Sequence, residues 1–370
     1  MADERDTPRF DPGGAIRILD ELPDPIVVVD RNRMIVTINR AARESFQVAA
    51  TGRNLAQAIR HPAILGAVDD VLAGRPGRSV ELSLAAPVRR DFILQVAALP
   101  HPAGALLAFH DVTEVRKWER MRADFVANVS HELRSPLASL VGLLETLTGP
   151  ARDDTEARGR FLGMMHEEAR RMARLVDDLL SLSRVEIHEH VQPRDAIDLT
   201  QVVGGVVELL ARRAAERDMR IEVVMPASLA AVAGDRDELV QVFQNLIDNA
   251  IKYGRIGSEI RIEARAVDRI PGRDKPGLSV AVIDQGEGIP EDDLPRLTER
   301  FYRVDKARSR ALGGTGLGLA IVKHIVNRHR GRFAIDSVLG RGSTFTVQLP
   351  LAETPVFSEM TAPAGPVTKL

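Results

Sequence analysis

The sequence predicts a multidomain α+β protein: a small α/β domain with five strands, then a helical hairpin, then an α/β sandwich. Two changes of pattern along the chain support this division. Short apolar runs separated by turn signals fill residues 15–112, whereas apolar residues at helical spacing begin near residue 113. From about residue 195, helix and strand patterns alternate, as expected for an α/β domain. The 370 residues are enough for three domains of ordinary size.

The composition excludes several classes of site. Cysteine is absent, so the chain forms no disulfide, cysteine-ligated zinc site or iron–sulfur cluster and uses no thiol chemistry. The 50 Lys and Arg residues nearly balance the 52 Asp and Glu residues, and we therefore expect no nucleic acid partner. No apolar run approaches the ~20 residues of a transmembrane helix. We expect a cytoplasmic protein without a transmembrane segment, which reaches a membrane only through a partner.

The first 112 residues begin with a lead and continue as a small mixed domain. Residues 1–14 are charged and rich in Pro and Gly, which predicts a disordered lead. The strands expected in residues 15–112 have the sequences PIVVVD, RMIVTI, SVELSLA, DFILQVAAL and GALLAFH. A helical stretch is expected between about residues 39 and 74. Five strands with inserted helices make a compact α+β domain.

Two helical segments between residues 113 and 190 carry apolar seams. A turn with Gly149, Pro150 and two aspartates separates them. The seams consist of Phe125, Val129, Leu133, Leu137, Leu140 and Leu144 in the first segment and of Phe161, Met165, Met172, Leu175, Leu179 and Leu182 in the second. Both seams are too wide for a single partner helix. We therefore expect two hairpins to form a four-helix bundle in a homodimer; the alternative is a hairpin that packs on its own chain.

Residues 195–350 alternate between strand and helix patterns. The expected strands are RIEVVM, EIRIEARAV, LSVAVID, RFAID and STFTVQL, and the expected helices lie near residues 198–216, 236–253 and 316–329. Asp235, with Glu238 three residues later, resembles a capping box at the start of the middle helix. These patterns predict an α/β sandwich, one sheet with helices on a face. Residues 351–370 are rich in Pro, Ala and Thr, which predicts a flexible tail.

One histidine in the first helical segment, FVANVSHELRSPLASL, has the position of a nucleophile. On a helical wheel His131 lies about 160–180° from Val129, Leu133 and Leu140, and it therefore faces water. An exposed imidazole near neutral pH is largely uncharged and offers one ring nitrogen for attack. Glu132 can hold the other ring nitrogen. Pro136 has no N–H, which predicts a bend at this turn of the helix.

Two other interpretations of His131 compete with the nucleophile. A single exposed histidine is commonly an ordinary surface residue. A zinc protease helix would need a second histidine four residues on, where this chain has Ser135, so that motif fails. The other histidines show no convincing metal-ligand spacing.

Four clusters in the last domain indicate a ligand that contains phosphate. In the first, NLIDNAIKYG, Asn245 and Asn249 share one helix face and Lys252 follows at the next turn. The two amide oxygens can share Mg²⁺ with phosphate oxygens, and Lys252 can neutralise phosphate charge. The cluster by itself is also consistent with a polar helix face.

The second cluster, AVIDQGEGIP, follows a predicted strand. Asp284 ends that strand, where its carboxylate can accept a hydrogen bond from an exocyclic amine. Gly286 and Gly288 allow the backbone to approach a purine closely.

The last two clusters are RFYRVD, with Phe301 and Arg303, and GGTGLGLAIVKHIV, whose glycines lead directly into a helix. The N–H groups at such a helix start form an anion site. The glycines match neither a dinucleotide fingerprint nor a Walker A loop. Each cluster alone is consistent with a tight turn, but four in this order within one domain predict a nucleotide site.

Together these motifs resemble those of bacterial two-component sensor histidine kinases. SHELRSPL is similar to the family's H box, NLIDNAIKYG to its N box, DQGEG to its G1 box, RFYRVD to its F box and GGTGLGLAIV to its G2 box. The segment that begins FVANVSHELRSPLASLVG and ends LVDDLLSLSR is most similar to the phosphate-regulon sensor kinase subfamily. The resemblance implies a PAS sensor domain over 15–112, a signalling helix with a dimerisation and histidine phosphotransfer hairpin over 113–190, and a Bergerat-type (GHKL) ATP-binding domain over 195–350.

The resemblance also implies a role for each motif. His131 would accept the γ-phosphoryl group of ATP with Glu132 as its base, and Ser135 would take part in regulator dephosphorylation. Asn249, helped by Asn245, would hold Mg²⁺. The ATP site would comprise Asn245, Asn249, Lys252, Tyr253, Asp284, Gly286, Gly288, Phe301, Arg303, Gly314, Thr315, Gly316, Leu317 and Gly318, with residues 304–315 as the ATP lid.

We therefore expect a sensor protein-histidine kinase, a phosphotransferase that phosphorylates His131 and passes the group to an aspartate in a response regulator's receiver domain. Signalling of the phosphate type and a regulator phosphatase activity are also expected. Two features depart from the family: Ser135 stands where Thr or Asn is frequent, and the membrane helices common in this subfamily have no counterpart. The alternatives are a non-catalytic ATP-binding signalling scaffold and a Bergerat-type ATPase. Such ATPases carry a glutamate where this chain has Asn245. The absence of that water-activating base favours transfer to a side chain.

Overall fold

The computed structural model describes residues 17–47, 51–84, 89–100, 103–226, 229–305 and 312–352. The chain divides into two compact units, Met1–Ala127 and Asn128–Leu370. The predicted lead, and the predicted tail from residue 353 onward, lie outside the described residues.

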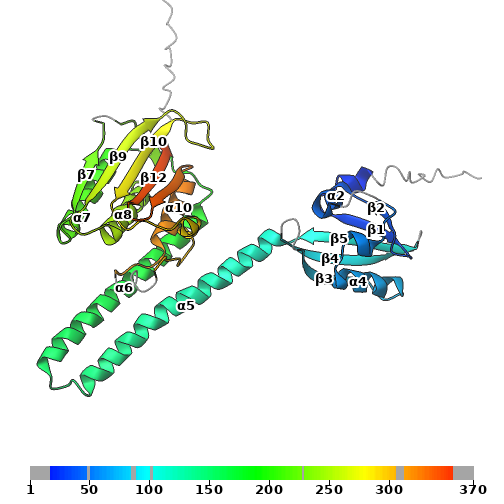
Figure 1. Ribbon diagram of the computed structural model, residues 1–370, viewed down its shortest axis with the longest axis horizontal. Helices are drawn as coiled ribbons and strands as arrows, with labels where there is room; N and C mark the ends of the chain where they lie inside the picture. Colours follow the sequence, from blue (N-terminus) through cyan, green and yellow to red (C-terminus); the bar gives the residue numbers. More distant parts are fainter. Residues whose placement is uncertain are drawn as a thin grey trace, which may run out of the picture. The chain divides into compact units, whose positions relative to one another are not determined.

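The first unit is a five-stranded antiparallel sheet with helices on one face (Figure 1). Its strands are β1 (Ile26–Asp30), β2 (Ile35–Ile38), β3 (Arg78–Leu84), β4 (Arg90–Leu99) and β5 (Gly104–Asp111), in the order β2-β1-β5-β4-β3. Its helices are α2 (Arg40–Phe46), α3 (Leu55–Ala58) and α4 (Pro62–Leu72). All five predicted strands are present, but the helical stretch expected between 39 and 74 consists of three short helices. The core is closed by Phe46, Phe92 and Phe109, whose rings meet edge to face.

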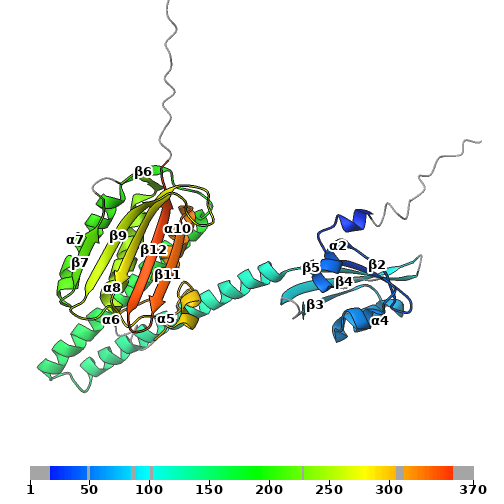
Figure 2. The same ribbon diagram turned by 45° about the horizontal axis from the view of Figure 1, so that its top comes forward.

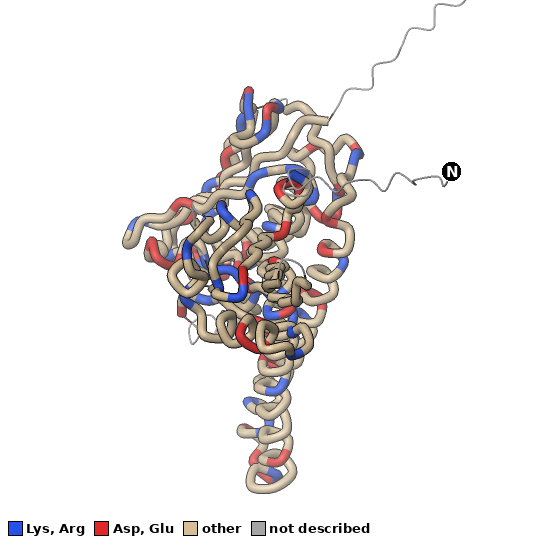
Figure 3. The backbone as a smooth tube through the Cα atoms, turned by 90° about the vertical axis from the view of Figure 1, so that its right-hand side faces the viewer, with Lys and Arg blue, Asp and Glu red and all other residues tan. Residues whose placement is uncertain are grey.

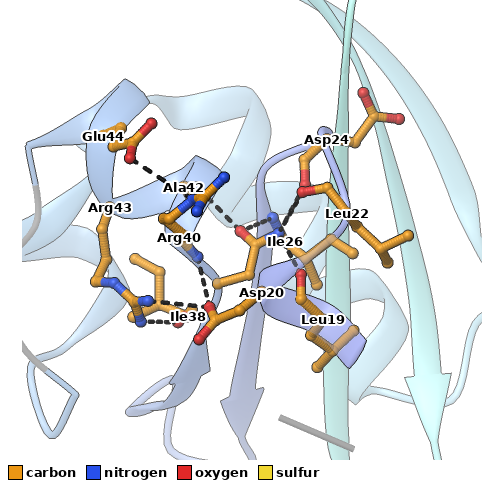
Figure 4. Close-up of polar contacts among 11 residues, drawn as sticks. Leu19, Asp20, Leu22, Asp24, Ile26, Ile38, Arg40, Ala42, Arg43 and Glu44 are labelled. Carbon is orange, nitrogen blue, oxygen red and sulfur yellow. Dashed lines mark hydrogen bonds and ion pairs between the residues drawn. The ribbon is translucent and has the colours of Figure 1, made fainter. Parts of the chain in front are cut away.

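A buried asparagine joins the start of the first unit to its sheet. Asn39, 1% exposed, caps α2 by accepting from the Ala42 N–H, and the same side-chain oxygen accepts from the Ile26 N–H, both at 2.9 Å. Its amide nitrogen donates to the carbonyl oxygens of Leu19 and Asp24 at 3.0 and 2.8 Å. Figure 4 shows the backbone groups of Leu19, Asp24, Ile26 and Ala42 close together. Because every polar atom is paired, this buried side chain is explained by structure alone.

The hairpin is formed by α5 (Thr113–Thr148) and α6 (Thr155–His188). Asp154 caps α6 by accepting from the Ala157 N–H at 2.9 Å. Helix α5 continues through Pro136 without a break, so the proline does not end it; the bend expected there stays a prediction. Figure 3 shows acidic and basic residues interspersed along these helices. No helix in the described part of the chain is long and apolar enough to cross a membrane.

The rest of the second unit is an α/β sandwich, as predicted. Its main sheet has the order β11-β12-β10-β9-β7, with only β7 and β9 parallel; β6 and β8 form a small separate sheet. The strands are β6 (Asp195–Ile197), β7 (Arg220–Val224), β8 (Val232–Gly234), β9 (Glu259–Val267), β10 (Gly277–Asp284), β11 (Arg332–Val338) and β12 (Gly342–Pro350). The helices are α7 (Leu199–Ala215), α8 (Arg236–Tyr253), the 3₁₀ helix η1 (Glu291–Arg296) and α10 (Gly318–Arg328).

Helices α7, α8 and α10 cover one face of this sheet (Figures 1 and 2). Strand β9 alternates between buried Ile260, Ile262 and Ala264 and outward-facing residues, the pattern of a sheet with one buried face. The buried face of α8 supplies Leu239, Val242, Phe243, Leu246, Ile247, Ala250 and Ile251. Helix α8 connects β7 to β9, which explains why that pair is parallel.

The start of α8 is fixed by a buried histidine. Asp235 caps the helix as predicted, accepting from the N–H groups of Asp237 and Glu238 at 3.0 and 3.2 Å. The return bond of a capping box is absent, because the Asp235 N–H donates instead to His329 Nε2 at 2.9 Å. His329 Nδ1 lies 2.8 Å from the Ile325 carbonyl oxygen, which assigns the ring proton to Nδ1. His329 is fully buried and must therefore be neutral in this arrangement.

We expect His329 to make the second unit less stable in mild acid. Burial lowers the pKa of the His329 imidazole below its ordinary value, whereas the unfolded chain takes up a proton near pH 6.5. As the pH falls through 6.5, protonation favours the unfolded chain, so stability is lost from there down to the lowered pKa. Urea midpoints measured by circular dichroism at pH 7.5 and 5.5 should therefore fall more in the wild type than in His329→Gln. Equal falls in both would contradict this; His166→Gln, an exposed histidine, is the control.

Candidate functional site

A cavity of about 650 Å³ opens between α8, α10 and the loop after β10. Most of the predicted ATP-site residues line it: Asn245, Asn249, Lys252, Tyr253, Asp284, Gly286, Gly288, Arg303, Gly314, Thr315, Gly316 and Gly318. Four clusters spread over about 75 positions of the sequence thus meet around one space.

Helix α8 forms the polar wall of the cavity. Asn245 and Asn249 are one turn apart on it, and Lys252 follows. The Asn245 Nδ2 atom is buried and has no hydrogen-bond partner among the described residues. An orphaned amide on a cavity wall is costly unless a ligand or water pairs with it. The amide oxygens of Asn245 and Asn249 are hard donors of the kind Mg²⁺ accepts beside phosphate oxygens, so these residues fit the ion.

Asp284 lies at the end of β10 and is 5% exposed. Its Oδ1 accepts from the Gly286 N–H at 2.8 Å. Burial raises the pKa of the Asp284 carboxyl, while the N–H groups of Gly286 and Ser343 act in the opposite direction. A Cβ on Gly286 would lie 2.6 Å from the Tyr253 carbonyl oxygen, so only glycine fits here. The buried carboxyl can recognise an amine that enters the cavity.

The glycine segment leads into α10 as predicted. Leu317 is the N-cap residue of α10 and provides no side-chain cap, and the Leu317 N–H donates to Thr315 Oγ1 at 3.3 Å. Gly318 and Leu319 begin the helix on the cavity wall. The first N–H groups of a helix lack partners within the helix and favour an anion. The cavity lining thus combines the Lys252 cation and the N–H groups of a helix start with a buried carboxyl, a set that suits a phosphorylated ligand with an amine-bearing ring.

His131 is exposed on α5, as predicted from its place on the helix face, and Ser135 is also exposed. Neither lines the cavity. Glu132 does not lie free beside His131: its Oε2 is 3.1 Å from Arg303 Nη2 and 3.5 Å from Arg171 Nη2.

Arg303 joins α5 to the cavity. It is 5% exposed, and its Nη2 donates both to Glu132 and to the Thr315 carbonyl oxygen, the latter at 2.7 Å. The residue beside His131 and the glycine segment on the cavity wall are therefore held by one guanidinium. Its Nε atom is buried without a partner among the described residues.

Helix α6 closes another side of the cavity. Asp178 Oδ2 accepts from the Thr315 hydroxyl at 2.6 Å, and burial raises the pKa of the Asp178 carboxyl. Arg174 lies against Gly313, whose φ is +69°. Near the end of α6, His324 Nδ1 of α10 is 3.1 Å from Glu189 Oε2. The hairpin and the sandwich are thus in polar contact along α6.

Two predicted site residues lie elsewhere. Leu317 is fully buried in the core, and Phe301 does not line the cavity; its N–H donates to the Gly316 carbonyl oxygen at 2.8 Å. Both hold the segments that carry the site rather than face the cavity. Part of the predicted lid, residues 306–311, lies outside the described residues.

The charged lining residues that were not predicted include Arg174, Asp178, Arg213 and Asp248. Asp248 had a readable signal, because it stands four residues before Lys252 on a helix, the spacing of an ion pair. The others come from α6 and α7, and no local pattern connects them with the cavity.

Three known protein families match parts of this chain. Residues 234–353 match the family model of histidine kinase-, DNA gyrase B- and HSP90-like ATPases, residues 121–187 the His kinase A (phospho-acceptor) domain, and residues 19–117 the PAS fold.

Two curated relatives match nearly the whole chain. The phosphate regulon sensor protein PhoR of Pseudomonas aeruginosa is 36% identical over 336 residues, which cover 90% of this chain and 73% of PhoR. Sensor histidine kinase WalK of Bacillus subtilis is 32% identical over 352 residues, which cover 91% of this chain and 55% of WalK. The chain thus spans about half the length of WalK.

A solved structure, histidine kinase ThkA in complex with response regulator protein TrrA, shares the fold. Its TM-score is 0.50 at 21% identity, and the match covers 90% of this chain and 97% of that one.

Proposed function

The chain belongs to the sensor histidine kinases, and we propose that it phosphorylates its own His131 with ATP and passes the phosphoryl group to an aspartate of a response-regulator receiver domain. One observation carries this proposal: Arg303 binds both Glu132, the neighbour of the exposed His131, and the Thr315 carbonyl on the cavity wall. A single side chain therefore connects the acceptor helix with the nucleotide cavity.

The residues of the cavity support transfer rather than hydrolysis. Phosphoryl transfer depends mainly on alignment and on neutralising charge. Lys252 would meet phosphate, and Asn249 with Asn245 would hold Mg²⁺, which supplies further charge neutralisation when bound. An asparagine at position 245 cannot take a proton from water, so the cavity wall offers no general base at that position. His131 provides an exposed imidazole as acceptor. Glu132, the next residue on α5, would be its base once its carboxylate leaves the arginines that hold it in this structure.

We further propose a homodimer through the hairpin. Large apolar side chains of α5 and α6 are more than 40% exposed: Leu137, Val141, Leu144, Leu162, Met164, Val176 and Leu180. A soluble surface seldom carries so many along two adjacent helices. A second hairpin would bury them and complete a four-helix bundle.

We also propose a type of signal and a second activity. Similarity to PhoR supports signalling of the phosphate type. Ser135 lies one helical turn from His131 and is exposed, so its hydroxyl can orient a water for dephosphorylation of the regulator.

Incubation of the full chain with γ-labelled ATP and Mg²⁺ tests the main proposal. We expect label that survives alkali but is lost in acid, the behaviour of phosphohistidine. His131→Gln should abolish it and His166→Gln, an exposed histidine of α6, should keep it. Nucleotide binding without label would favour the scaffold alternative. Steady phosphate release without any phosphoprotein would favour an ATPase, and undiminished label in His131→Gln would refute the assignment.

A further inference from the structure

An ion-pair chain runs from α7 into the cavity and ends on Lys252. The Lys252 ammonium lies 2.7 Å from Asp248 Oδ2, and the guanidinium of Arg213 pairs with Asp248 Oδ1. Each carboxylate oxygen thus holds a different cation, and all three residues line the cavity. The Lys252 and Asp248 side chains are only 11% and 18% exposed, so solvent screens their pair weakly.

The turn that follows α7 holds the backbone of Lys252. Arg217 follows Arg213 by one turn and its Nη1 donates to the Lys252 carbonyl oxygen at 2.9 Å. Its Nη2 is 3.5 Å from the Gly254 carbonyl oxygen, just past the end of α8. Carbonyls in the last turn of a helix lack partners within the helix and favour a cation. Arg217, just past the end of α7, thus fixes the Lys252 backbone, and Arg213 of α7 anchors the carboxylate that holds the Lys252 side chain.

Fixing this lysine matters because its side chain is long and flexible. Ordering a lysine side chain costs rotamer entropy. If the side chain is already ordered before the ligand binds, this entropy cost does not reduce the binding affinity. The carboxylate of Asp248 would by itself weaken phosphate binding, but Arg213 offsets it. Two cations and one anion leave the trio with a net positive charge.

We propose that Asp248, anchored by Arg213, is a positioning residue that holds the Lys252 ammonium ready for the phosphates of the nucleotide. The inference deepens the proposed function and rests on its nucleotide site. It assigns Asp248 an effect on the phosphate part of the ligand and none on the adenosine part.

Calorimetric titration of the full chain with adenosine, ADP and ATP tests this. We expect Asp248→Asn to weaken ADP and ATP binding about tenfold, the loss of one charge-assisted contact, with adenosine binding unchanged. Lys252→Met should lose as much affinity for ADP and ATP. The double variant of Asp248→Asn with Lys252→Met should lose no more than either single variant, because the two residues act as one unit. Asp237→Asn, which removes an exposed carboxylate from the first turn of the same helix, should leave all three affinities unchanged.

Three results would overturn the inference. Tighter or equal ATP binding by Asp248→Asn would mean that the carboxylate only repels phosphate or does nothing. Equal weakening for adenosine and ATP would mean a merely structural role, and additive losses in the double variant would mean independent action. Any of these with normal labelling of His131 leaves the proposed function standing. The expected pattern without labelling of His131 removes the proposed function alone, and a wild type that binds no adenine nucleotide removes both.

Discussion

Replacing Gly288 with alanine is expected to weaken ADP and ATP binding by about tenfold or more, because a displaced backbone misplaces ligand groups. The φ of Gly288 is +72°, and a Cβ there would lie 2.2 Å from the Val338 carbonyl oxygen and 2.8 Å from the Leu339 Cα. Both neighbours are backbone atoms that cannot rotate away, so the loop after β10 has to move. That loop begins at Asp284 and lines the cavity, so its movement shifts the groups proposed to hold adenosine.

Gly257→Ala is the matched control for this substitution. The φ of Gly257 is +77°, but no atom lies within 4 Å of a Cβ built there. Alanine at either position therefore carries the same left-handed strain, roughly 1–2 kcal/mol, and only Gly288→Ala adds a clash. Calorimetric titration with ADP compares the two variants with the wild type. Full affinity in Gly288→Ala, or the same loss in both variants, would show that the close approach does not shape the site.

The long elements could be predicted from sequence because their apolar residues repeat over several turns or strand pairs. Helix α8 spans Arg236–Tyr253, as expected, since its buried face recurs at helical spacing. Strands β6 and β8 were missed, because three residues do not establish a period. The first unit's helices were expected as one stretch; Asn39 and Asn54 start separate helices there, and Gly52 adopts a φ of +84° between them.

The site could be predicted as a set of residues but not as a set of contacts. Motif spacing brought Asn245, Asn249 and Lys252 together, because one helix face carries all three. The RFYRVD motif placed Arg303 at the nucleotide site, and Arg303 does line the cavity, but its guanidinium also binds Glu132, 171 positions earlier in the chain. A contact over that separation depends on how the sandwich packs against the hairpin, and no local pattern in either segment encodes it.

Replacing Arg303 with alanine is expected to slow phosphorylation of His131 by about 100-fold, while the affinity for ADP changes by less than about tenfold. The guanidinium is the only group among the described residues that is seen to join Glu132 to the glycine segment, at 3.1 Å from the carboxylate and 2.7 Å from the Thr315 carbonyl. Without it, Glu132 keeps Arg171, at 3.5 Å, as its one ion-pair partner among the described residues, and Thr315 loses a donor. The cavity keeps its other walls, so alignment of the acceptor suffers more than binding.

Two further variants separate alignment from simple loss of charge. Arg303→Lys keeps the positive charge but not the planar fork that serves two acceptors at once, so it should recover only part of the rate. Arg296→Ala removes a cation from the same region, one that stacks over Tyr302 at 4.2 Å and makes no contact with Glu132, and should leave the rate unchanged. Initial labelling rates at saturating ATP, set against ADP affinities, decide the matter. If rate and affinity fall in parallel in Arg303→Ala, or if lysine restores the full rate, Arg303 contributes charge to nucleotide binding and its bond to Glu132 plays no part in transfer.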